Sequence, residues 1–129
     1  MILDTSFIID LLKGNRLAVD KVIELENSSK PILATAISVF EIWQGTADIK
    51  NEGKKQRILD MMGSFGLLVL DFESAKEGGE IHSRLEKKGM QIEPEDSMIA
   101  GICIKNNKKI MTRNVKHFNR IKDLEIETY

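Results

Sequence analysis

Three carboxylic acids lie in segments of this chain that otherwise have the composition of a hydrophobic core: Asp4, Glu41 and Asp96. Carboxylates are rarely buried without a partner. If the fold brings the three together, their mutual repulsion requires protons or a cation. Hard divalent metal ions take oxygen ligands of this kind. The residue types therefore indicate a metal-dependent enzyme.

Asp4 and Glu41 each have a plainer interpretation. An aspartate between a strand and a helix can cap the helix, although Thr5 or Ser6 could do so equally well, which favours a site role for Asp4. Glu41 could lie on the polar face of a half-buried helix. Its apolar neighbours leave both interpretations of Glu41 open.

Asp96 could simply complement the positive end of a helix that begins near Pro94, where acidic residues are favoured. However, Ile99 and Cys103 follow it at intervals of three and seven residues. This spacing predicts that Asp96 faces inward with them, whereas Glu95 should point elsewhere.

Short apolar runs alternate with longer helical patterns along the chain. The expected strands are Ile2–Leu3, Ile32–Ala34, Leu67–Leu70, Lys109–Met111 and Leu124–Ile126. The expected helices are Ser6–Leu12, Leu17–Glu26, Ser38–Thr46, Glu52–Met62, Phe72–Lys88 and Glu95–Asn106, with breaks at Gly14-Asn15 and from Gly63 to Gly66. Mostly apolar strands are typical of a parallel sheet that is covered on both faces.

This alternation predicts a three-layer α/β/α fold with a central, mainly parallel sheet of four to five strands, as a single domain over residues 1–129. Ligands bind at the carboxyl ends of the strands in such sheets. Asp4 follows the first strand and Thr112-Arg113-Asn114 follows the fourth. Both segments are therefore expected at the site.

The composition fits a globular cytoplasmic protein. The chain has 129 residues, of which 42% are hydrophobic and 30% charged, and a net charge of -1. The only cysteine, Cys103, excludes an internal disulfide and a cysteine-rich zinc site. No convincing signal peptide or apolar stretch of about 20 residues is present, so no membrane association is expected.

Four motifs, in order and spacing, resemble those of PIN-domain ribonucleases, most closely the VapC-type toxins of toxin–antitoxin modules. The motifs are Leu3-Asp4-Thr5-Ser6, Ser38-Val39-Phe40-Glu41-Ile42-Trp43-Gln44-Gly45, Asp96-Ser97-Met98-Ile99-Ala100-Gly101 and Thr112-Arg113-Asn114-Val115-Lys116-His117-Phe118. The resemblance covers essentially the whole chain.

The resemblance implies Mg²⁺- or Mn²⁺-dependent endonucleolytic cleavage of RNA, a cognate antitoxin that blocks the site, and a homodimer. Asp4, Glu41 and Asp96 match the three core acidic positions and become the expected catalytic and metal-binding residues, Glu41 either directly or through water. Asn114 stands where many relatives carry a fourth acid, which favours one firmly held metal ion and leaves a second one open.

Other polar residues of the motifs are expected to support the acids. Ser6 and Thr112 would orient a metal ligand or a water molecule through their hydroxyl groups. Asn114 joins them in this supporting group.

Seven basic residues and no acid occur between residues 105 and 122. Such a run usually forms a solvated face, but beside an acidic metal site it could bind the RNA backbone. Arg113 and Lys116 are the expected RNA-binding residues because they lie within the last motif.

The sequence leaves two other classes of function open. One is a non-catalytic PIN-like module that binds RNA or protein. The other is an aspartate-based phosphoryl-transfer domain, which also gathers acids at strand ends. Phosphatases of the haloacid dehalogenase type need a second aspartate two residues after the first, where this chain has Ser6.

Overall fold

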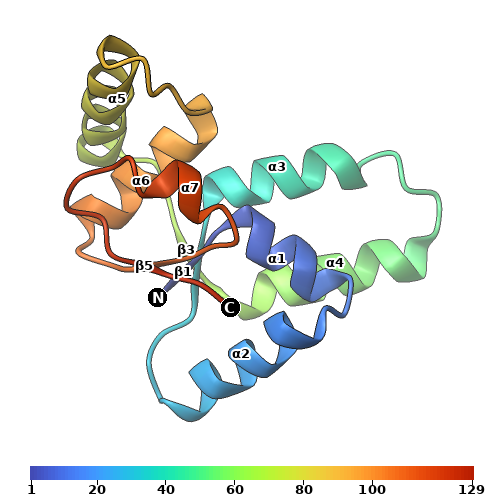
Figure 1. Cartoon of the computed structure of the whole chain (residues 1–129). Coiled ribbons are helices and arrows are strands. Elements are labelled where there is room, and N and C mark those ends of the chain that lie inside the picture. The colour runs from blue at the N-terminus through green and yellow to red at the C-terminus, as the bar shows by residue number, and fades with distance from the viewer.

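The computed structural model describes all residues from 1 to 129, which form five strands and seven helices (Figure 1). In chain order these are β1 Ile2–Leu3, α1 Thr5–Leu12, α2 Arg16–Asn27, β2 Leu33–Thr35, α3 Ala36–Thr46, α4 Glu52–Ser64, β3 Gly66–Leu68, α5 Phe72–Lys87, α6 Pro94–Lys105, β4 Ile110–Met111, α7 Val115–Phe118 and β5 Ile126–Glu127. None of the helices combines the length and the apolar character that crossing a bilayer requires.

All neighbouring strands are parallel, in the order β3-β2-β1-β4-β5. Ile2 of β1 pairs with Leu33 on one side and with Ile110 on the other. Since the strands are parallel, the residues that follow β1, β2 and β4 meet at one edge of the sheet. The predicted three-layer α/β/α fold with a parallel sheet is confirmed.

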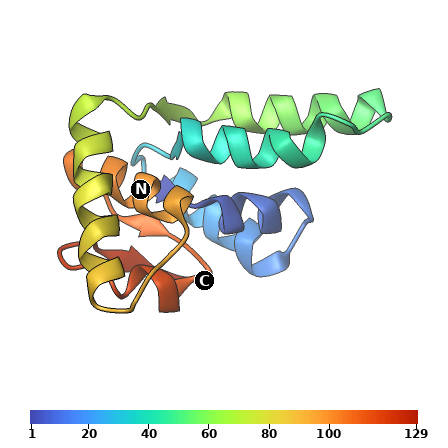
Figure 2. The same ribbon diagram turned by 90° about the horizontal axis from the view of Figure 1, so that it is seen from above.

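The strands separate two hydrophobic cores. Consecutive residues of a strand point to opposite faces, and accordingly Ile2 packs with residues of α5 and α6 while Leu3 packs with residues of α1 to α4. Figure 2 shows these two groups of helices on opposite sides of the sheet, with α3 and α4 extending away from it. The sheet therefore fixes α1 and α6 relative to each other.

Helices α5 and α6 approach closely because glycines lie at their contact. A Cβ atom added to Gly101 would lie 2.4 Å from the carbonyl oxygen of Ser74, and one added to Gly78 would lie 2.9 Å from that of Ser97. No side chain larger than hydrogen fits there without a backbone shift. This contact fixes α6, which carries Asp96.

Three helices and strands differ clearly in extent from the sequence-based expectation. Helix α7 was not predicted because it is a single turn. Helix α4 continues through Gly63, where a break was expected, and β5 begins later than predicted because Asp123 adopts a left-handed conformation (φ 68°) that forms a turn.

The prediction that the strands are covered on both faces is wrong for β3. This strand lies at the edge of the sheet, and Leu67 and the following Val69 are 55% and 59% exposed. Their apolar character had suggested a buried strand.

Candidate functional site

Asp4 lies at the carboxyl end of the central strand β1 and is almost completely buried, with 1% exposure. Its side chain does not cap α1. Instead, Oδ2 accepts hydrogen bonds from the hydroxyl groups of Ser6 (2.8 Å) and Thr112 (2.7 Å). Ser6 belongs to α1, and Thr112 follows β4, so two neighbouring elements fix this carboxylate. Ser6 and Thr112, which were predicted to support the acids, thus both contact Asp4.

The second oxygen of Asp4 has no partner. Oδ1 is buried, and no donor reaches it. A buried acceptor without a partner is costly in a folded protein. A carboxylate oxygen that no hydrogen-bond donor satisfies is suited to a cation.

Glu41 approaches from α3 and is half-buried. Its Oε1 lies 2.7 Å from the hydroxyl group of Thr5, which also lies 2.9 Å from Ser38 Oγ. A hydroxyl group has one proton, so Thr5 donates to the carboxylate while accepting from Ser38. Burial and the negative charges of Asp4 and Glu95 raise the pKa of Glu41 above its usual range, although the bond from Thr5 opposes this.

Asp96 occupies the first turn of α6, and its side chain is 14% exposed. Burial, followed by the charges of Asp4 and Glu41, raises the pKa of Asp96 to about 6, and the nearby His117 opposes the shift. His117 Nδ1 lies 3.5 Å from Asp96 Oδ2 and has no hydrogen-bond partner. The three predicted acids therefore lie near one another, close enough for the charge of Asp4 to raise the pKa of both Glu41 and Asp96.

The acids do not form a ready-made chelating group. No three histidine, cysteine, aspartate or glutamate side chains are grouped so that they could hold a metal ion as they stand. Asp4 faces hydroxyl groups, Glu41 faces Thr5 and Asp96 faces His117. The site is a cluster of neighbouring oxygen donors, with Asp4 as its most rigid member.

Asn114 begins the single turn of α7, and its side chain does not cap that helix. Its backbone N–H donates to Thr112 Oγ1 at 2.9 Å. The backbone of Asn114 is thereby tied to the hydroxyl group that contacts Asp4. Asn114 therefore lies beside the acids that it was predicted to support.

The basic run does not form one face. Lys105 pairs with Asp71 at 2.6 Å, and Lys109 pairs with Glu125 at 3.2 Å. The carbonyl group of Lys109 accepts from Ile2 N–H at the start of β1, so Lys109 lies at the sheet edge opposite Asp4. Two exposed residues of the run follow β4 at the acidic edge, Arg113 and Lys116.

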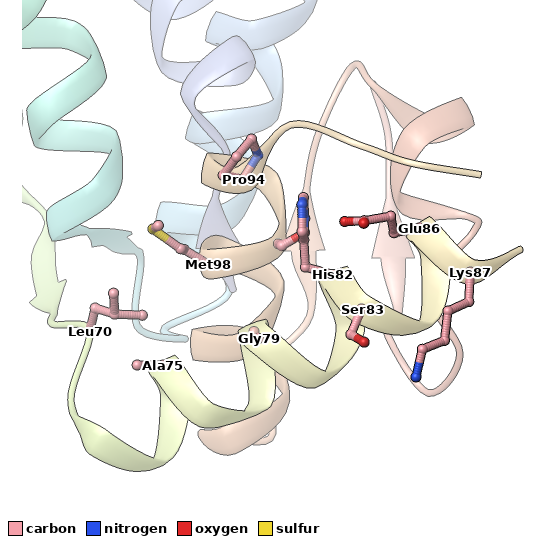
Figure 3. Close-up of a pocket in the computed structure, with 11 residues that line it drawn as sticks. Leu70, Ala75, Gly79, His82, Ser83, Glu86, Lys87, Pro94 and Met98 are labelled. Atoms are coloured by element: carbon pink, nitrogen blue, oxygen red, sulfur yellow. The ribbon is translucent and has the colours of Figure 1, made fainter. Parts of the chain in front are cut away.

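A separate pocket of about 390 Å³ lies between α5 and α6 (Figure 3). Within it, His82 Nδ1 lies 2.8 Å from Ser97 Oγ. None of the three acids lines this pocket. His82 is therefore not part of the acidic cluster.

Comparison with known protein families gives a match over nearly the whole chain. The family model of the PIN domain matches residues 1–124. The chain belongs to the PIN-domain family. The motif-based recognition of this family is thereby confirmed.

Individual relatives of this PIN-domain chain have similar lengths. It is 34% identical to ribonuclease VapC2 of Rickettsia felis over 83% of its length and 81% of that protein. It is 30% identical to ribonuclease VapC1 of Methanocaldococcus jannaschii over 100% of its length and 86% of that protein. The crystal structure of VapBC2 from Rickettsia felis, bound to a promoter DNA fragment, superposes with a TM-score of 0.87 at 25% identity, covering 99% of this chain and 97% of the other.

The sequence did not predict the roles of several residues around the site of this PIN-domain chain. Thr5 was considered as a helix cap but instead contacts Glu41. His117 stands three residues after Asn114, and this helical spacing was the available signal for it. Glu95, expected to point away, is half-buried and close enough to raise the pKa of Glu41.

Proposed function

We propose that this chain is a Mg²⁺- or Mn²⁺-dependent endoribonuclease and the toxin of a type II toxin–antitoxin pair. The observation that carries the proposal is the buried Asp4 carboxylate at the centre of the sheet's carboxyl edge, with one unpartnered oxygen and with Glu41 and Asp96 near it. The ribonuclease names of the two relatives support the same reaction.

The donor set fits a hard divalent cation because it consists of carboxylate oxygens. Asp4 would hold the cation most directly, and Asp96 and Glu41 would complete its protein ligands, Glu41 either directly or through water. When bound, such an ion polarises the phosphodiester and activates water for attack. A single firmly held ion is expected because Asn114, which is neutral, occupies the fourth position.

The chain's own residues prepare this site. Ser6 and Thr112 fix the orientation of Asp4, and Thr5 fixes that of Glu41. Arg113 and Lys116, exposed just beyond Thr112, would bind phosphates of the RNA through charge.

An antitoxin partner is supported by a groove of about 410 Å³ that includes Glu41 in its lining. Isoleucine and leucine side chains of α1, α3, α4 and the α3–α4 loop line it, together with the basic residues Lys13, Lys54 and Arg57. An apolar segment with acidic flanks would fit this groove and cover the site. Leu12→Glu should therefore weaken inhibition by the protein encoded beside this chain.

A homodimer is supported by exposed apolar side chains on α3 and on the segment from β3 to the start of α5. Phe40 is 62% exposed and Phe72 is 79% exposed. A surface of this kind commonly marks a protein interface. Light scattering should give twice the chain mass, and Phe40→Asp with Phe72→Asp should give a monomer.

The function is tested with the purified chain, free of antitoxin, and a mixture of cellular RNA. Cleavage should occur with Mg²⁺ or Mn²⁺ and stop with EDTA or with Asp96→Asn. Asp71→Asn is the matched control, because Asp71 caps α5 and pairs with Lys105 at the end of α6 opposite Asp96.

RNA binding without metal-dependent cleavage would instead support the non-catalytic alternative. A stable phosphoryl group on Asp4 after treatment with acetyl phosphate would support phosphoryl transfer. Cleavage that survives both EDTA and Asp96→Asn would contradict the proposed mechanism.

A further inference from the structure

Asp10 is a second nearly buried carboxylate on the same helix as Ser6, one turn further along α1, with 6% exposure. Oδ1 accepts from Arg113 Nη1 at 2.7 Å, and Oδ2 accepts from the hydroxyl group of Tyr129 at 2.6 Å. Both oxygens of this carboxylate are thus occupied by protein donors.

Tyr129 is itself held in place. Its ring packs edge-on against the buried Phe7, with ring centroids 4.7 Å apart and an interplanar angle of 89°. Burial and the hydrogen bond to Asp10 raise the pKa of Tyr129 above its usual range. The hydroxyl group therefore keeps its proton and acts as a donor to Asp10.

Arg113 joins this arrangement to the acidic cluster. Its backbone N–H lies 3.3 Å from Ser6 Oγ, and it directly follows Thr112, which donates to Asp4. The arginine side chain is 58% exposed although the carboxylate that it contacts is buried. A guanidinium group has five N–H donors, and Asp10 is the only hydrogen-bond partner of the Arg113 guanidinium group. The exposed guanidinium group therefore keeps donors that have no partner within the protein.

We propose that Asp10 and Tyr129 are positioning residues that hold the Arg113 guanidinium group at the rim of the acidic cluster, ready to bind a phosphate of the RNA next to the cleaved bond. This proposal rests on the proposed function. An arginine that is already oriented loses less conformational freedom on binding, and its planar donors match a phosphate in pairs.

A purely structural role explains the arrangement less well. An ion pair with an exposed arginine contributes little to stability, whereas burying a carboxylate is costly. The fold nevertheless places a buried carboxylate and a tyrosine hydroxyl group behind an exposed arginine next to Thr112. Orienting the Arg113 side chain would explain why the Asp10 carboxylate and the Tyr129 hydroxyl group lie there.

The test compares Tyr129→Phe and Asp10→Asn with the unchanged chain in RNA cleavage at several RNA concentrations. Tyr129→Phe keeps the aromatic packing and removes one hydroxyl group. Since a rim contact binds substrate and transition state alike, KM should rise about fivefold in each variant while kcat stays within about twofold. Asp71→Asn, which alters an exposed aspartate–lysine pair away from the site, should leave both constants unchanged.

A double-mutant comparison separates positioning from general destabilisation. Arg113→Ala should raise KM by about tenfold and lower the salt dependence of RNA binding by about one phosphate contact. In the Arg113→Ala background, Tyr129→Phe should change KM no further. Thermal unfolding confirms that each variant is folded at the assay temperature, and Tyr129→Phe carries the test if Asp10→Asn does not fold.

The outcomes are distinguishable from failure of the proposed function. A chain that neither binds nor cleaves RNA would refute that function itself. Normal cleavage together with an unchanged KM in Tyr129→Phe, or an equal KM effect with and without Arg113, would overturn the positioning roles alone.

Discussion

Asp4 and the pair formed by Glu41 and Asp96 are built in different ways. Asp4 follows a central strand, is buried, and receives two hydrogen bonds from α1 and the β4–α7 segment. Glu41 and Asp96 extend from helices on opposite faces of the sheet and remain partly exposed. Their pKa values are raised mainly by burial and then by neighbouring negative charge.

This contrast separates a rigid ligand from adaptable ones. Two hydroxyl donors hold the Asp4 carboxylate at a fixed place. Glu41 and Asp96 are repelled by neighbouring negative charge, which Thr5 and His117 offset only in part and which a divalent cation would relieve. We infer that Asp4 defines where the cation binds, while the two helical acids adjust to it.

The largest expected effect is at Asp4. Asp4→Asn keeps the side-chain shape and a hydrogen-bond acceptor but removes the charge at the most rigid ligand. Because metal-ion catalysis contributes several kcal/mol, cleavage should fall by at least about 100-fold. Glu41→Gln should cost only about tenfold if Glu41 acts through water. Single-turnover cleavage of one RNA by both variants checks this, and equal losses would erase the distinction.

A smaller difference is expected between the hydroxyl groups that support the acids. Thr112→Val removes a buried donor to Asp4, and the loss of such a supporting contact typically costs 10- to 100-fold in metal affinity or activity, so we expect about 30-fold here. Thr5→Val removes the donor to the half-exposed Glu41, which water can replace, so about threefold is expected. Metal-concentration dependence of cleavage measures both. A larger effect from Thr5→Val would reverse the assignment of rigid and adaptable ligands.

The smallest effect is expected when a thiol reagent is added, because Cys103 lies within the core on α6, behind Asp96. Burial raises the pKa of this thiol to about 12, so it stays protonated at ordinary pH, and its reactivity should rise only as the pH approaches that value. Iodoacetamide at pH 8 should leave the folded chain unmodified for hours and react with the chain in urea. Rapid modification of the folded chain, followed by mass spectrometry, would mean that α6 opens and is not a firm support for Asp96.

The sequence predicted correctly those features that depend on residues close together in the chain. The apolar runs predicted the parallel sheet, and its geometry placed Asp4 and Thr112 at one edge. The inward face predicted for Asp96 also agrees with the structure. Local patterns were enough for the strands and for the orientation of Asp96, because both depend on residues that are neighbours in the sequence.

Long-range contacts were beyond such patterns. Nothing near Asp10 in the sequence indicates Tyr129, which lies 119 residues away and reaches it only after the sheet has formed. The basic run looked continuous along the chain, yet strand β4 carries Lys109 to one edge of the sheet and Arg113 to the other.

The central claim is that the Asp4 cluster binds one divalent cation, and calorimetric titration of the purified, antitoxin-free chain with Mn²⁺ tests it most directly. The unchanged chain should bind a single Mn²⁺ ion, and Asp4→Asn should bind none while unfolding at a similar temperature. Equal binding by the two proteins, or no binding by the unchanged chain, would contradict the claim.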